Sequence, residues 1–298
     1  MLALIAGHGQ LPAKVAAAQD VRPLICGLEG QLPDRVTADL VFRLETLGSL
    51  LLELGERGIT EVCLCGGIER PDLDPAKLDD ETRPLVPLLS EALAKGDDGA
   101  LRIVMQIIGQ TGFRIRAAHE LAPKALAEVG VKSARTPRAV HDADARVGAG
   151  VLAEMGAADL GQACVIRKGQ VLLREDDAGT DAMLKKLGLD YGARPKGPVE
   201  SWLCDEAGEL SETAREWLAI LRDANLAAPG VGGVLYKGPK PGQDRRVDLP
   251  TIGPLTALNA AEAGLDGIVI EAGDMIVIDP DLVVAIVDAM NMVFWVRP

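Results

Sequence analysis

The pattern that most constrains the fold is an alternation, early in the chain, of short apolar runs with longer amphipathic ones. The apolar runs at residues 2–6, 61–65 and 113–117 have the length and composition of buried strands. Between them, residues 44–57 and 101–111 show the spacing of amphipathic helices. Strands that alternate with helices predict a parallel sheet covered on both faces. The N-terminal part is therefore expected to be α/β.

The second half of the chain combines the two patterns differently. Residues 163–177 read as two strands joined by Lys168 and Gly169, which predicts a hairpin. Residues 267–279 form another apolar pair around an Ala-Gly turn, so we expect a second hairpin there. Helical runs cover 212–226, 254–263 and 282–289. This half is also expected to be α/β, with a mixed sheet.

The length of 298 residues allows one large domain or two of ordinary size. Residues 131–145 are polar and lack a strong period, which is typical of a linker. We therefore predict a first domain over 1–130, a linker over 131–145 and a second domain over 146–298.

Composition restricts the partners and the compartment. A formal net charge of −13 argues against broad binding to a nucleic-acid backbone. An aromatic content of 3% argues against stacking on single-stranded bases, so no nucleic-acid partner is expected. The five scattered cysteines read as buried reduced thiols. Because no apolar run approaches the ~20 residues that span a bilayer, and the first residues read as a strand, we expect a cytoplasmic protein.

Cations are concentrated in one segment of this acidic chain. Residues 237–253 read KGPKPGQDRRVDLPTIG, and their glycines and prolines predict an ordered loop rather than a helix. The segment ends in Asp248, Thr251 and Gly253, just before a helical run. Cations, a carboxylate, a hydroxyl and a helix N-terminus are the groups that hold a phosphate and a metal together. The alternative interpretation is a solvated loop with surface charges.

Glycine turns follow two of the predicted strands. Gly7-His8-Gly9 precedes a helix, and Gly66-Gly67 ends another strand. Ligands of open α/β sheets bind at the carboxyl ends of strands, so Gly7, Gly9 and the adjacent Gln10 are candidate contacts for a nucleotide. The GxGxxG pattern is incomplete because position 12 is Pro. Tight structural turns are the alternative.

An acidic group precedes another predicted helix start. Gly179, Thr180 and Asp181 open the helix, and Glu175 lies shortly before them together with Asp176 and Asp177. Oxygen-only clusters suit Mg²⁺, which shares the phosphates of its substrate. A solvated acidic face with Thr180 as a helix cap is the alternative.

Five segments together resemble a known enzyme family. They are AGHGQLP from residue 6, DLGQ from 159, GTDAML from 179, KPGQDRRVDLPTIG from 240 and AGLDGIVIEAG from 263. In this order they resemble the UDP-2,3-diacylglucosamine pyrophosphatases of bacterial lipid A synthesis, of the type unrelated to calcineurin-like phosphoesterases. Matches run through nearly the whole chain, and RVDLPTIG and GTDAML are the specific ones.

The resemblance implies a fold and an activity. The fold would be a Rossmann-like N-terminal domain followed by a family-specific α/β domain. The activity would be Mg²⁺-dependent hydrolysis of the diphosphate of UDP-2,3-diacylglucosamine, giving UMP and 2,3-diacylglucosamine 1-phosphate. Water would attack the phosphorus nearer the sugar. With a lipid-linked sugar nucleotide as substrate, we expect at most transient peripheral contact with the inner membrane surface. A homodimer stays an open option.

The resemblance also implies site residues. The essential aspartate of the family matches Asp248, which we expect to bind metal or orient water. Asp181 and Glu175 are the further candidates for magnesium, and Asp181 and Lys240 are also candidates for catalysis. The remaining predicted substrate contacts in this half are Gly179, Thr180, Lys237, Gln243, Arg246 and Thr251.

One position departs from the family. The chain has Ala178 before Gly179-Thr180-Asp181, where the family usually has Glu. Glu175 is expected to take that role, with Asp176 or Asp177 as substitutes. Two other kinds of function stay open, namely a non-catalytic nucleotide- or lipid-binding protein and a sugar-nucleotide transferase.

Overall fold

The structure is a computed structural model that describes residues 1–69, 71–95, 97–158, 160–190, 203–204, 209–227, 231–240, 244–247, 249–273 and 275–298. The chain divides into two compact units. Unit 1 comprises Met1–Lys124 and Gln243–Asp248. Unit 2 comprises Ala125–Gly242 and Leu249–Pro298.

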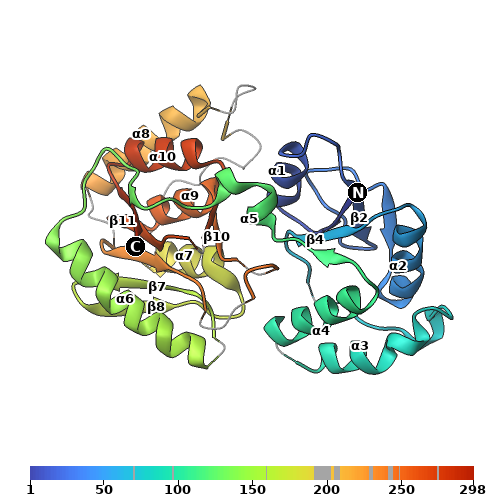
Figure 1. The fold of residues 1–298 in the computed structure, drawn as a ribbon. Helices are drawn as coiled ribbons and strands as arrows, with labels where there is room; N and C mark the ends of the chain where they lie inside the picture. Colours follow the sequence, from blue (N-terminus) through green and yellow to red (C-terminus); the bar gives the residue numbers. More distant parts are fainter. Residues whose placement is uncertain are drawn as a thin grey trace. The chain divides into compact units, whose positions relative to one another are not determined.

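Unit 1 is built on a parallel sheet. Its strands lie in the order β3-β2-β1-β4-β5, and each neighbouring pair is parallel (Figure 1). The strands are β1 (Leu2–Ala6), β2 (Leu24–Leu28), β3 (Leu40–Phe42), β4 (Glu61–Cys65) and β5 (Arg114–Ile115). This order is that of a Rossmann half, with the switch point between β1 and β4. The predicted parallel sheet and Rossmann-like domain are confirmed.

Helices of unit 1 bury one apolar stripe each. They are α1 (Leu11–Ala17), α2 (Leu47–Glu56), α3 (Val86–Leu93), α4 (Asp97–Gln110) and α5 (Ala118–Leu121), with 3₁₀ turns at Leu44–Thr46, Pro75–Lys77, Arg83–Leu85 and Pro123–Ala125. In α2 the buried leucines recur at positions 47, 50, 51 and 54, which is the spacing of one helical face. They share a core with Ala3 and Ile5 of β1 and with Ile107 of α4.

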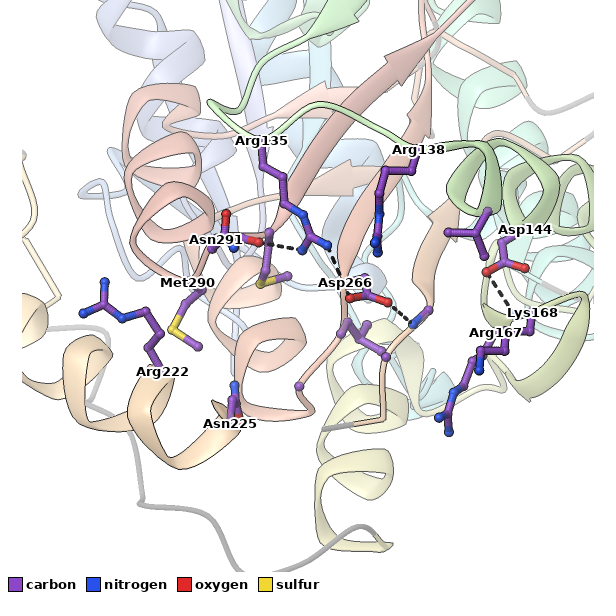
Figure 2. A pocket seen from close by; sticks show the side chains of 16 residues that line it. Arg135, Arg138, Asp144, Arg167, Lys168, Arg222, Asn225, Asp266, Met290 and Asn291 are labelled. Carbon is purple, nitrogen blue, oxygen red and sulfur yellow. Dashed lines mark hydrogen bonds and ion pairs between the residues drawn. The ribbon is translucent and has the colours of Figure 1, made fainter. Parts of the chain in front are cut away.

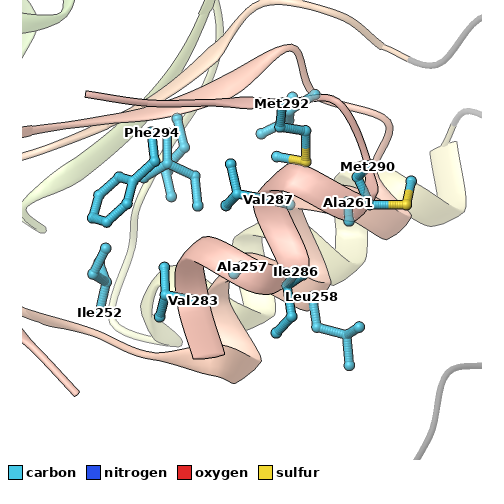
Figure 3. Close-up of a cluster of buried hydrophobic side chains, with 14 of the residues drawn as sticks. Ile252, Ala257, Leu258, Ala261, Val283, Ile286, Val287, Met290, Met292 and Phe294 are labelled. Carbon is cyan, nitrogen blue, oxygen red and sulfur yellow. The ribbon is translucent and has the colours of Figure 1, made fainter. Parts of the chain in front are cut away.

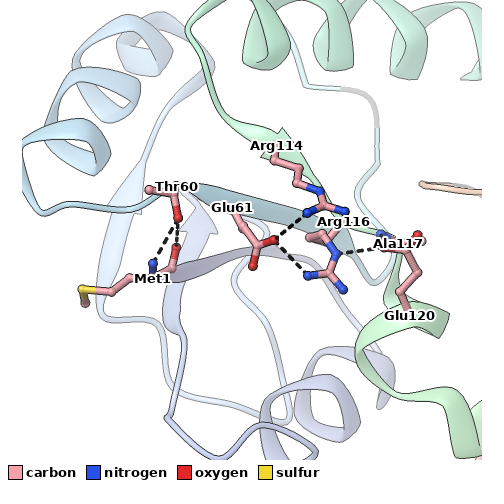
Figure 4. A network of polar contacts seen from close by, with 7 residues as sticks. All are labelled: Met1, Thr60, Glu61, Arg114, Arg116, Ala117 and Glu120. Atoms are coloured by element: carbon pink, nitrogen blue, oxygen red, sulfur yellow. Dashed lines mark hydrogen bonds and ion pairs between the residues drawn. The ribbon is translucent and has the colours of Figure 1, made fainter.

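The two-residue strand β5 is secured by polar contacts as well as by pairing. Glu61 Oε1 accepts a hydrogen bond of 2.9 Å from Arg116 Nη1 and lies 3.8 Å from Arg114 Nη1 (Figure 4). Arg116 Nε also donates to Glu120 at 2.9 Å, and this bond holds the pKa of the Glu120 carboxyl below its usual value. At the same edge, the Met1 ammonium donates to Thr60 Oγ1 at 3.2 Å. These contacts tie the start of β4 to Met1, to β5 and to Arg116, which follows β5.

Unit 2 contains a mixed sheet in the order β6-β13-β11-β9-β7-β8 (Figure 1). Its strands are β6 (Gly130–Val131), β7 (Ala163–Arg167), β8 (Gln170–Arg174), β9 (Val234–Lys237), β11 (Gly267–Glu271) and β13 (Val293–Arg297). The pairs of β9, β11 and β13 are parallel, whereas β6, β7 and β8 pair antiparallel. The predicted hairpin of β7 and β8 is confirmed, with positive φ angles of 49° at Lys168 and 77° at Gly169. The mixed sheet is confirmed too.

The second predicted hairpin is wrong. β11 pairs with β9 and β13, whereas β12 (Ile276–Val277) pairs in parallel with β10 (Thr251–Ile252) in a separate two-stranded sheet. Each of these parallel pairs is joined through a helical crossover, because parallel strands require one. A strand pattern does not say which distant strand will be the partner, and the short turn between β11 and β12 suggested local pairing.

Helices cover both faces of the mixed sheet. On one face lies α6 (Ala139–Ala157), which packs Leu152 and Met155 against Ile166, Val234 and other sheet residues. The other helices are α7 (Gly179–Asp190), α8 (Glu212–Ala227), α9 (Pro254–Glu262) and α10 (Pro280–Ala289), and their apolar side chains join the larger core of the other face. Figure 3 shows α10 in this core, with Val283 and Val287 turned toward the strand residue Phe294.

The predicted linker over 131–145 needs correction. Val131 ends strand β6, and residues 139–145 form the first two turns of α6. His141, Asp144 and Ala145 of this stretch are buried. The buried side chains include a histidine and an aspartate, so the apolar spacing that identifies a helix face is missing here. The boundary between the units falls at residues 124 and 125, ahead of the predicted one.

None of the helices in the described ranges combines the length and the apolar character needed to cross a bilayer.

Candidate active site

Three of the predicted residues of unit 2 meet in one buried cluster. Glu175 follows β8 directly, Thr180 lies in the first turn of α7, and Lys237 is the last residue of β9. These positions come from an edge hairpin, a helix N-terminus and the carboxyl end of a parallel strand. The carboxyl ends of parallel strands are where open α/β sheets present functional groups.

The hydroxyl of Thr180 connects the two charged groups of this cluster. Lys237 Nζ donates a hydrogen bond to Thr180 Oγ1 at 2.8 Å. Thr180 Oγ1 in turn donates to Glu175 Oε1 at 2.5 Å. The hydroxyl proton therefore points at the carboxylate, and the hydroxyl lone pairs face the ammonium. The contact of Thr180 with the substrate stays a prediction.

Because the three side chains are buried, each of them needs its partner. The exposed fractions are 8% for Glu175, 6% for Thr180 and 6% for Lys237. A buried charge is costly unless it is paired and hydrogen-bonded, and removal of one partner leaves the other uncompensated. The cluster therefore holds a fixed ammonium in a weakly screened environment, which is the type of group that stabilises developing negative charge on phosphate.

Backbone groups of the DLGQ segment complete the cluster. The amide of Gln162 donates to Glu175 Oε2 at 2.5 Å, so both carboxylate oxygens accept a hydrogen bond. The carbonyl of Gln162 accepts from the amide of Gly238 at 3.2 Å. A Cβ added at Gly161 would lie 2.7 Å from Cβ of Glu175, so only glycine allows this close approach. This segment was part of the family resemblance and had no predicted role in the site.

Tyr236 and Glu271 form a second pair beside Lys237. The Tyr236 hydroxyl donates to Glu271 Oε1 at 2.7 Å, and Glu271 is the last residue of β11. Burial, and then the bond to this carboxylate, raise the pKa of the Tyr236 hydroxyl. Gly238 lies against the carboxyl group, since a Cβ there would be 3.0 Å from its carbon atom. Glu271 precedes the predicted Ala-Gly turn and was not among the predicted site residues; its place at the carboxyl end of a parallel strand was the available signal.

Asp181 is the one predicted metal ligand of this region with an unsatisfied oxygen. Its Oδ1 atom is buried and has no hydrogen-bond partner among the described residues. Buried carboxylate oxygens without a partner are costly and need an explanation, of which a bound cation is one. The position before Gly179 is exposed, as are Asp176 and Asp177. Ala178 thus stands at the surface of the turn, where its amide donates to Asp176 Oδ1 at 3.0 Å.

The described side chains are compatible with a magnesium ion that also binds substrate phosphates and water. They do not form a metal site made of protein side chains alone. The described residues contain no group of three or more His, Cys, Asp or Glu side chains placed to hold a metal. Magnesium is often bound by one or two carboxylates together with substrate phosphates and water. Asp181 fits one such position. Glu175, with both oxygens engaged, is better suited to hold Thr180 and Lys237 in place.

The other predicted residues of this half make contacts of their own or fall outside the described part. Asp248 and Gln243 fall outside the described residues. Arg246 donates to both carboxylate oxygens of Asp244, at 2.9 and 2.6 Å, in the segment grouped with unit 1. Thr251 starts β10, and its hydroxyl donates to the carbonyl of Leu249 at 3.2 Å. Lys240 is half-buried and belongs to unit 2.

In unit 1 the two glycine turns lie against each other at the switch point of the sheet. His8 and Gly67 exchange backbone hydrogen bonds of 2.7 and 3.0 Å. A Cβ added at Gly7 would be 2.2 Å from the carbonyl oxygen of Gly67, so this approach requires glycine. Gly7 and Gly66 therefore serve as tight structural turns, which was the alternative interpretation. The two turns also lie at the crevice where such folds bind nucleotides.

Gly9 has a different role in the same turn. Its φ angle of +93° requires glycine, and its amide donates to Asp34 Oδ1 at 2.7 Å. A carboxylate at this position repels a phosphate but accepts hydrogen bonds from a ribose. The Gly9 amide is thus engaged by Asp34, and the contact of Gly9 with a nucleotide stays a prediction. Gln10 follows and is half-buried.

Comparisons with known proteins agree with this architecture. The model of the LpxI N-terminal domain matches residues 1–125, and that of the LpxI C-terminal domain matches residues 128–198 and 216–295. A protein of Caulobacter vibrioides named UDP-2,3-diacylglucosamine pyrophosphatase LpxI is 34% identical over 298 residues, covering 98% of this chain and 95% of that protein. The resemblance found in the sequence is confirmed: the chain belongs to the LpxI family.

Proposed function

We propose that this protein is a Mg²⁺-dependent hydrolase that cleaves the diphosphate of UDP-2,3-diacylglucosamine to UMP and 2,3-diacylglucosamine 1-phosphate. The identity of 34% with the Caulobacter protein of that name, over nearly the whole length of both chains, supports the substrate. The observation that carries the chemistry is the buried link from Glu175 through Thr180 to Lys237. It belongs to the part that matches the LpxI C-terminal domain.

The cluster would offset the negative charge of the diphosphate. The diphosphate of the substrate is negative and repels an attacking nucleophile, so cleavage needs fixed positive charge near the phosphate oxygens. The ammonium of Lys237 is held by Thr180, and Glu175 orients Thr180 in turn. Since the three groups are buried, they need little reorganisation when the substrate binds. Lys240 is a second cation of the same unit and is assigned to the same task.

Magnesium, when bound, supplies a Lewis acid that binds phosphate oxygens and offsets their charge. The residues proposed to hold it are Asp181, whose buried Oδ1 lacks a partner among the described residues, and Asp248. Asp248 is also the residue proposed to orient the attacking water. Glu175 is proposed as a positioning residue rather than as a ligand.

The nucleotide end of the substrate is assigned to the glycine turns of unit 1. Asp34, which binds the Gly9 amide, offers a carboxylate to the ribose hydroxyls. Gly7 and Gln10 are proposed to shape the same crevice. Peripheral contact with a membrane surface, where the lipid substrate resides, is part of this proposal.

Product analysis in ¹⁸O-labelled water tests the reaction. Incubation with substrate and Mg²⁺ alone should release UMP without label and place one ¹⁸O in the sugar phosphate, because water attacks the phosphorus nearer the sugar. Label in UMP would place the attack at the other phosphorus. A transferase would release little UMP without an acceptor, and a binding protein would release none.

The variant Asp248→Ala tests the assigned carboxylate. It should lose nearly all Mg²⁺-dependent UMP release while its circular dichroism and unfolding midpoint stay close to those of the parent protein. Full activity in this variant would remove the assignment.

A further inference from the structure

A cavity of about 450 Å³ opens at the end of the mixed sheet opposite to Lys237. It is lined by residues that directly precede three parallel strands, namely Gly233 before β9, Asp266 before β11 and Met292 before β13. Lys237 and Glu271 lie at the other ends of β9 and β11. A strand rises ~3.3 Å per residue, so the length of β9 separates this cavity from the buried lysine by roughly 10 Å. The proposed reaction does not use it.

The lining is cationic in a chain that is anionic as a whole. Five cationic side chains (Arg135, Arg138, Arg167, Lys168 and Arg222) and two carboxylates (Asp144 and Asp266) line the cavity. Five positive against two negative groups leave a local charge of +3, whereas the chain carries −13. Local charge of this sign attracts anions and raises their concentration at the site.

The two carboxylates are already engaged in holding the walls. Asp144 accepts from the amides of Lys168 and Gly169 at 3.0 and 2.7 Å, and so supports the turn of the β7–β8 hairpin. Asp266 accepts from the Gly233 amide at 2.9 Å and lies 3.7 Å from Arg135 (Figure 2). Among the described residues, neither carboxylate lies within ion-pair distance of Arg138, Arg167, Lys168 or Arg222.

Most of the cations lack an acidic partner in the described part of the chain. Arg135 is engaged, since it lies near Asp266 and also donates to the Asn291 carbonyl at 2.7 Å. Arg138, Arg167 and Lys168 form no ion pair with a described acidic residue, and Arg222 is 4.0 Å from Asp223. Figure 2 shows Arg135 and Arg138 both directed toward Asp266 from the segment that precedes α6.

A helix N-terminus adds to the positive potential of the cavity. The 19-residue helix α6 begins after Arg138, and Val140 of its first turn lines the cavity. The amino end of a helix carries partial positive charge and unsatisfied amides, which favour an anion. Behind it, His141 is fully buried, and its Nε2 atom has no hydrogen-bond partner among the described residues.

Part of the lining of the cavity is apolar. Leu265, Met290 and Met292 contribute it, and all three are buried. A cavity of this size falls in the range of ~300–1,000 Å³ that is usual for small ligands, and it exceeds what one phosphate ion needs. Guanidinium groups bind phosphate, and the apolar side chains beside them suit a small organic group on that phosphate.

We propose that this cavity is a second binding site of the protein, which takes a phosphate ester at the amino ends of β9, β11 and β13. Arg138, Arg167 and Lys168 bind the phosphate oxygens, with the first turn of α6 beside them. The ester group lies over Met290 and Met292. The ligand is either a soluble phosphate ester or the headgroup of an anionic phospholipid, because both present the same phosphate.

Protection of individual arginines from phenylglyoxal tests the site in the intact protein. The probes are glycerol 1-phosphate at constant ionic strength, vesicles of phosphatidylcholine with phosphatidylglycerol, and vesicles of phosphatidylcholine alone. Peptide mass analysis should show that a phosphate probe slows modification of Arg138 and Arg167 at least fivefold. Arg146 is the internal control because it lies on the same helix, is exposed and does not line the cavity.

The pattern across the probes identifies the source of the phosphate. Protection by glycerol 1-phosphate shows a site for soluble esters, and protection only by phosphatidylglycerol vesicles shows a headgroup site. No protection by any probe, or equal protection of Arg146, overturns the proposal.

A variant pair gives an independent measure of affinity. Arg138→Gln together with Arg167→Gln should weaken binding of the effective probe at least tenfold in calorimetry, whereas Arg146→Gln should leave it within twofold. Unchanged binding in the double variant would also overturn the proposal. Because the readout is binding and not UMP release, failure here leaves the proposed function untouched.

Discussion

The Nζ atom of Lys237, at the end of β9, lies 2.8 Å from the Oγ1 atom of Thr180, in the first turn of α7. The two residues are 57 positions apart in the chain. The same hydroxyl donates to Glu175, so a single threonine joins a buried cation to a buried anion. Substitution of Thr180 should therefore change both the activity and the stability of the protein.

Thr180→Val should uncouple the two charges. The substitution keeps the shape of the side chain and removes the hydroxyl, so Lys237 and Glu175 each lose a buried hydrogen bond. Loss of such a bond costs about 1–3 kcal/mol. UMP release should fall at least tenfold, and urea unfolding should show the lower stability. Thr180→Ser retains the hydroxyl and should keep most of the activity; if Ser and Val behave alike, the hydroxyl has no part in the cluster.

Asp181→Asn should raise the magnesium requirement. The substitution removes the charge but keeps the size of a side chain whose Oδ1 is buried without a partner in the described part. Titration of UMP release with Mg²⁺ should show a half-maximal concentration that is at least tenfold higher. Asp223→Asn on α8 is the control, since this carboxylate is 75% exposed. An unchanged magnesium titration would remove Asp181 from the proposed ligands.

Gly148→Ala should strain the packing of α6 on the sheet. A Cβ at this position would lie 2.6 Å from Cγ of the Tyr236 ring, and Tyr236 is 2% exposed. Overpacking of this kind costs about 1–3 kcal/mol. Gly150, on the same helix, has no atom within 4 Å of an added Cβ. Gly150→Ala should therefore stabilise the helix by about 0.5–1 kcal/mol. Thermal unfolding compares the pair, and destabilisation of both to the same extent would contradict this packing.

His141 should make stability depend on pH. Its burial lowers the pKa of the imidazole, an effect that outweighs the neighbouring carboxylates of Asp266 and Asp144; the cations Arg135 and Arg138 act in the same direction as burial. The unfolded chain thus binds a proton more readily than the folded one. Stability should be complete above pH ~6.5 and should fall as the pH decreases below that value.

The variant His141→Asn separates this effect from other titrations. Asparagine retains an acceptor for the Arg138 amide, which donates to His141 Nδ1 at 3.1 Å, but it does not titrate. Urea midpoints measured from pH 7.5 to 5.5 should decline less steeply in the variant. Parallel curves for the two proteins would show that His141 is not the group responsible.

Cys204 should be the thiol that reacts in the folded protein. Cys26, Cys63, Cys65 and Cys164 are buried, whereas Cys204 is exposed, which the expectation of five buried thiols missed. Burial raises the pKa of the Cys26 and Cys164 thiols to about 12, so little thiolate is present. Native mass spectrometry after maleimide treatment should show one label, and unfolding should expose all five. Early labelling of a strand cysteine would contradict the burial.

Local patterns predicted the elements well where they were strongly periodic. The strand of residues 2–6, the hairpin at Lys168-Gly169 and the helix that opens with Pro254 agree with the structure. The first two turns of the helix over 139–157 were predicted to belong to a linker, because they carry polar residues that tertiary contacts bury. Burial of His141 and Asp144 depends on partners more than 20 residues away, such as the amide of Lys168.

The structure brings some of the candidate site residues together. Glu175, Thr180 and Lys237 were chosen by residue type and by their resemblance to a family, and the structure brings all three into contact. Glu271 and Gln162 were missed as contributors, since their roles arise from Tyr236 and from the backbone of the cluster. The donation from the Thr180 hydroxyl to Glu175 was not foreseen either, because a sequence does not show which neighbour takes a hydroxyl proton.

The sequence by itself determined the alternation of strands and helices, the parallel N-terminal sheet and the family, because these depend on local periodicity and on motifs of adjacent residues. Only the tertiary structure decided that β11 and β12 belong to different sheets, that an ammonium and a carboxylate share one threonine, and that cations from separate segments line one cavity. Those relationships arise from strand pairing and burial between residues far apart in the chain, and local preference does not encode the partner.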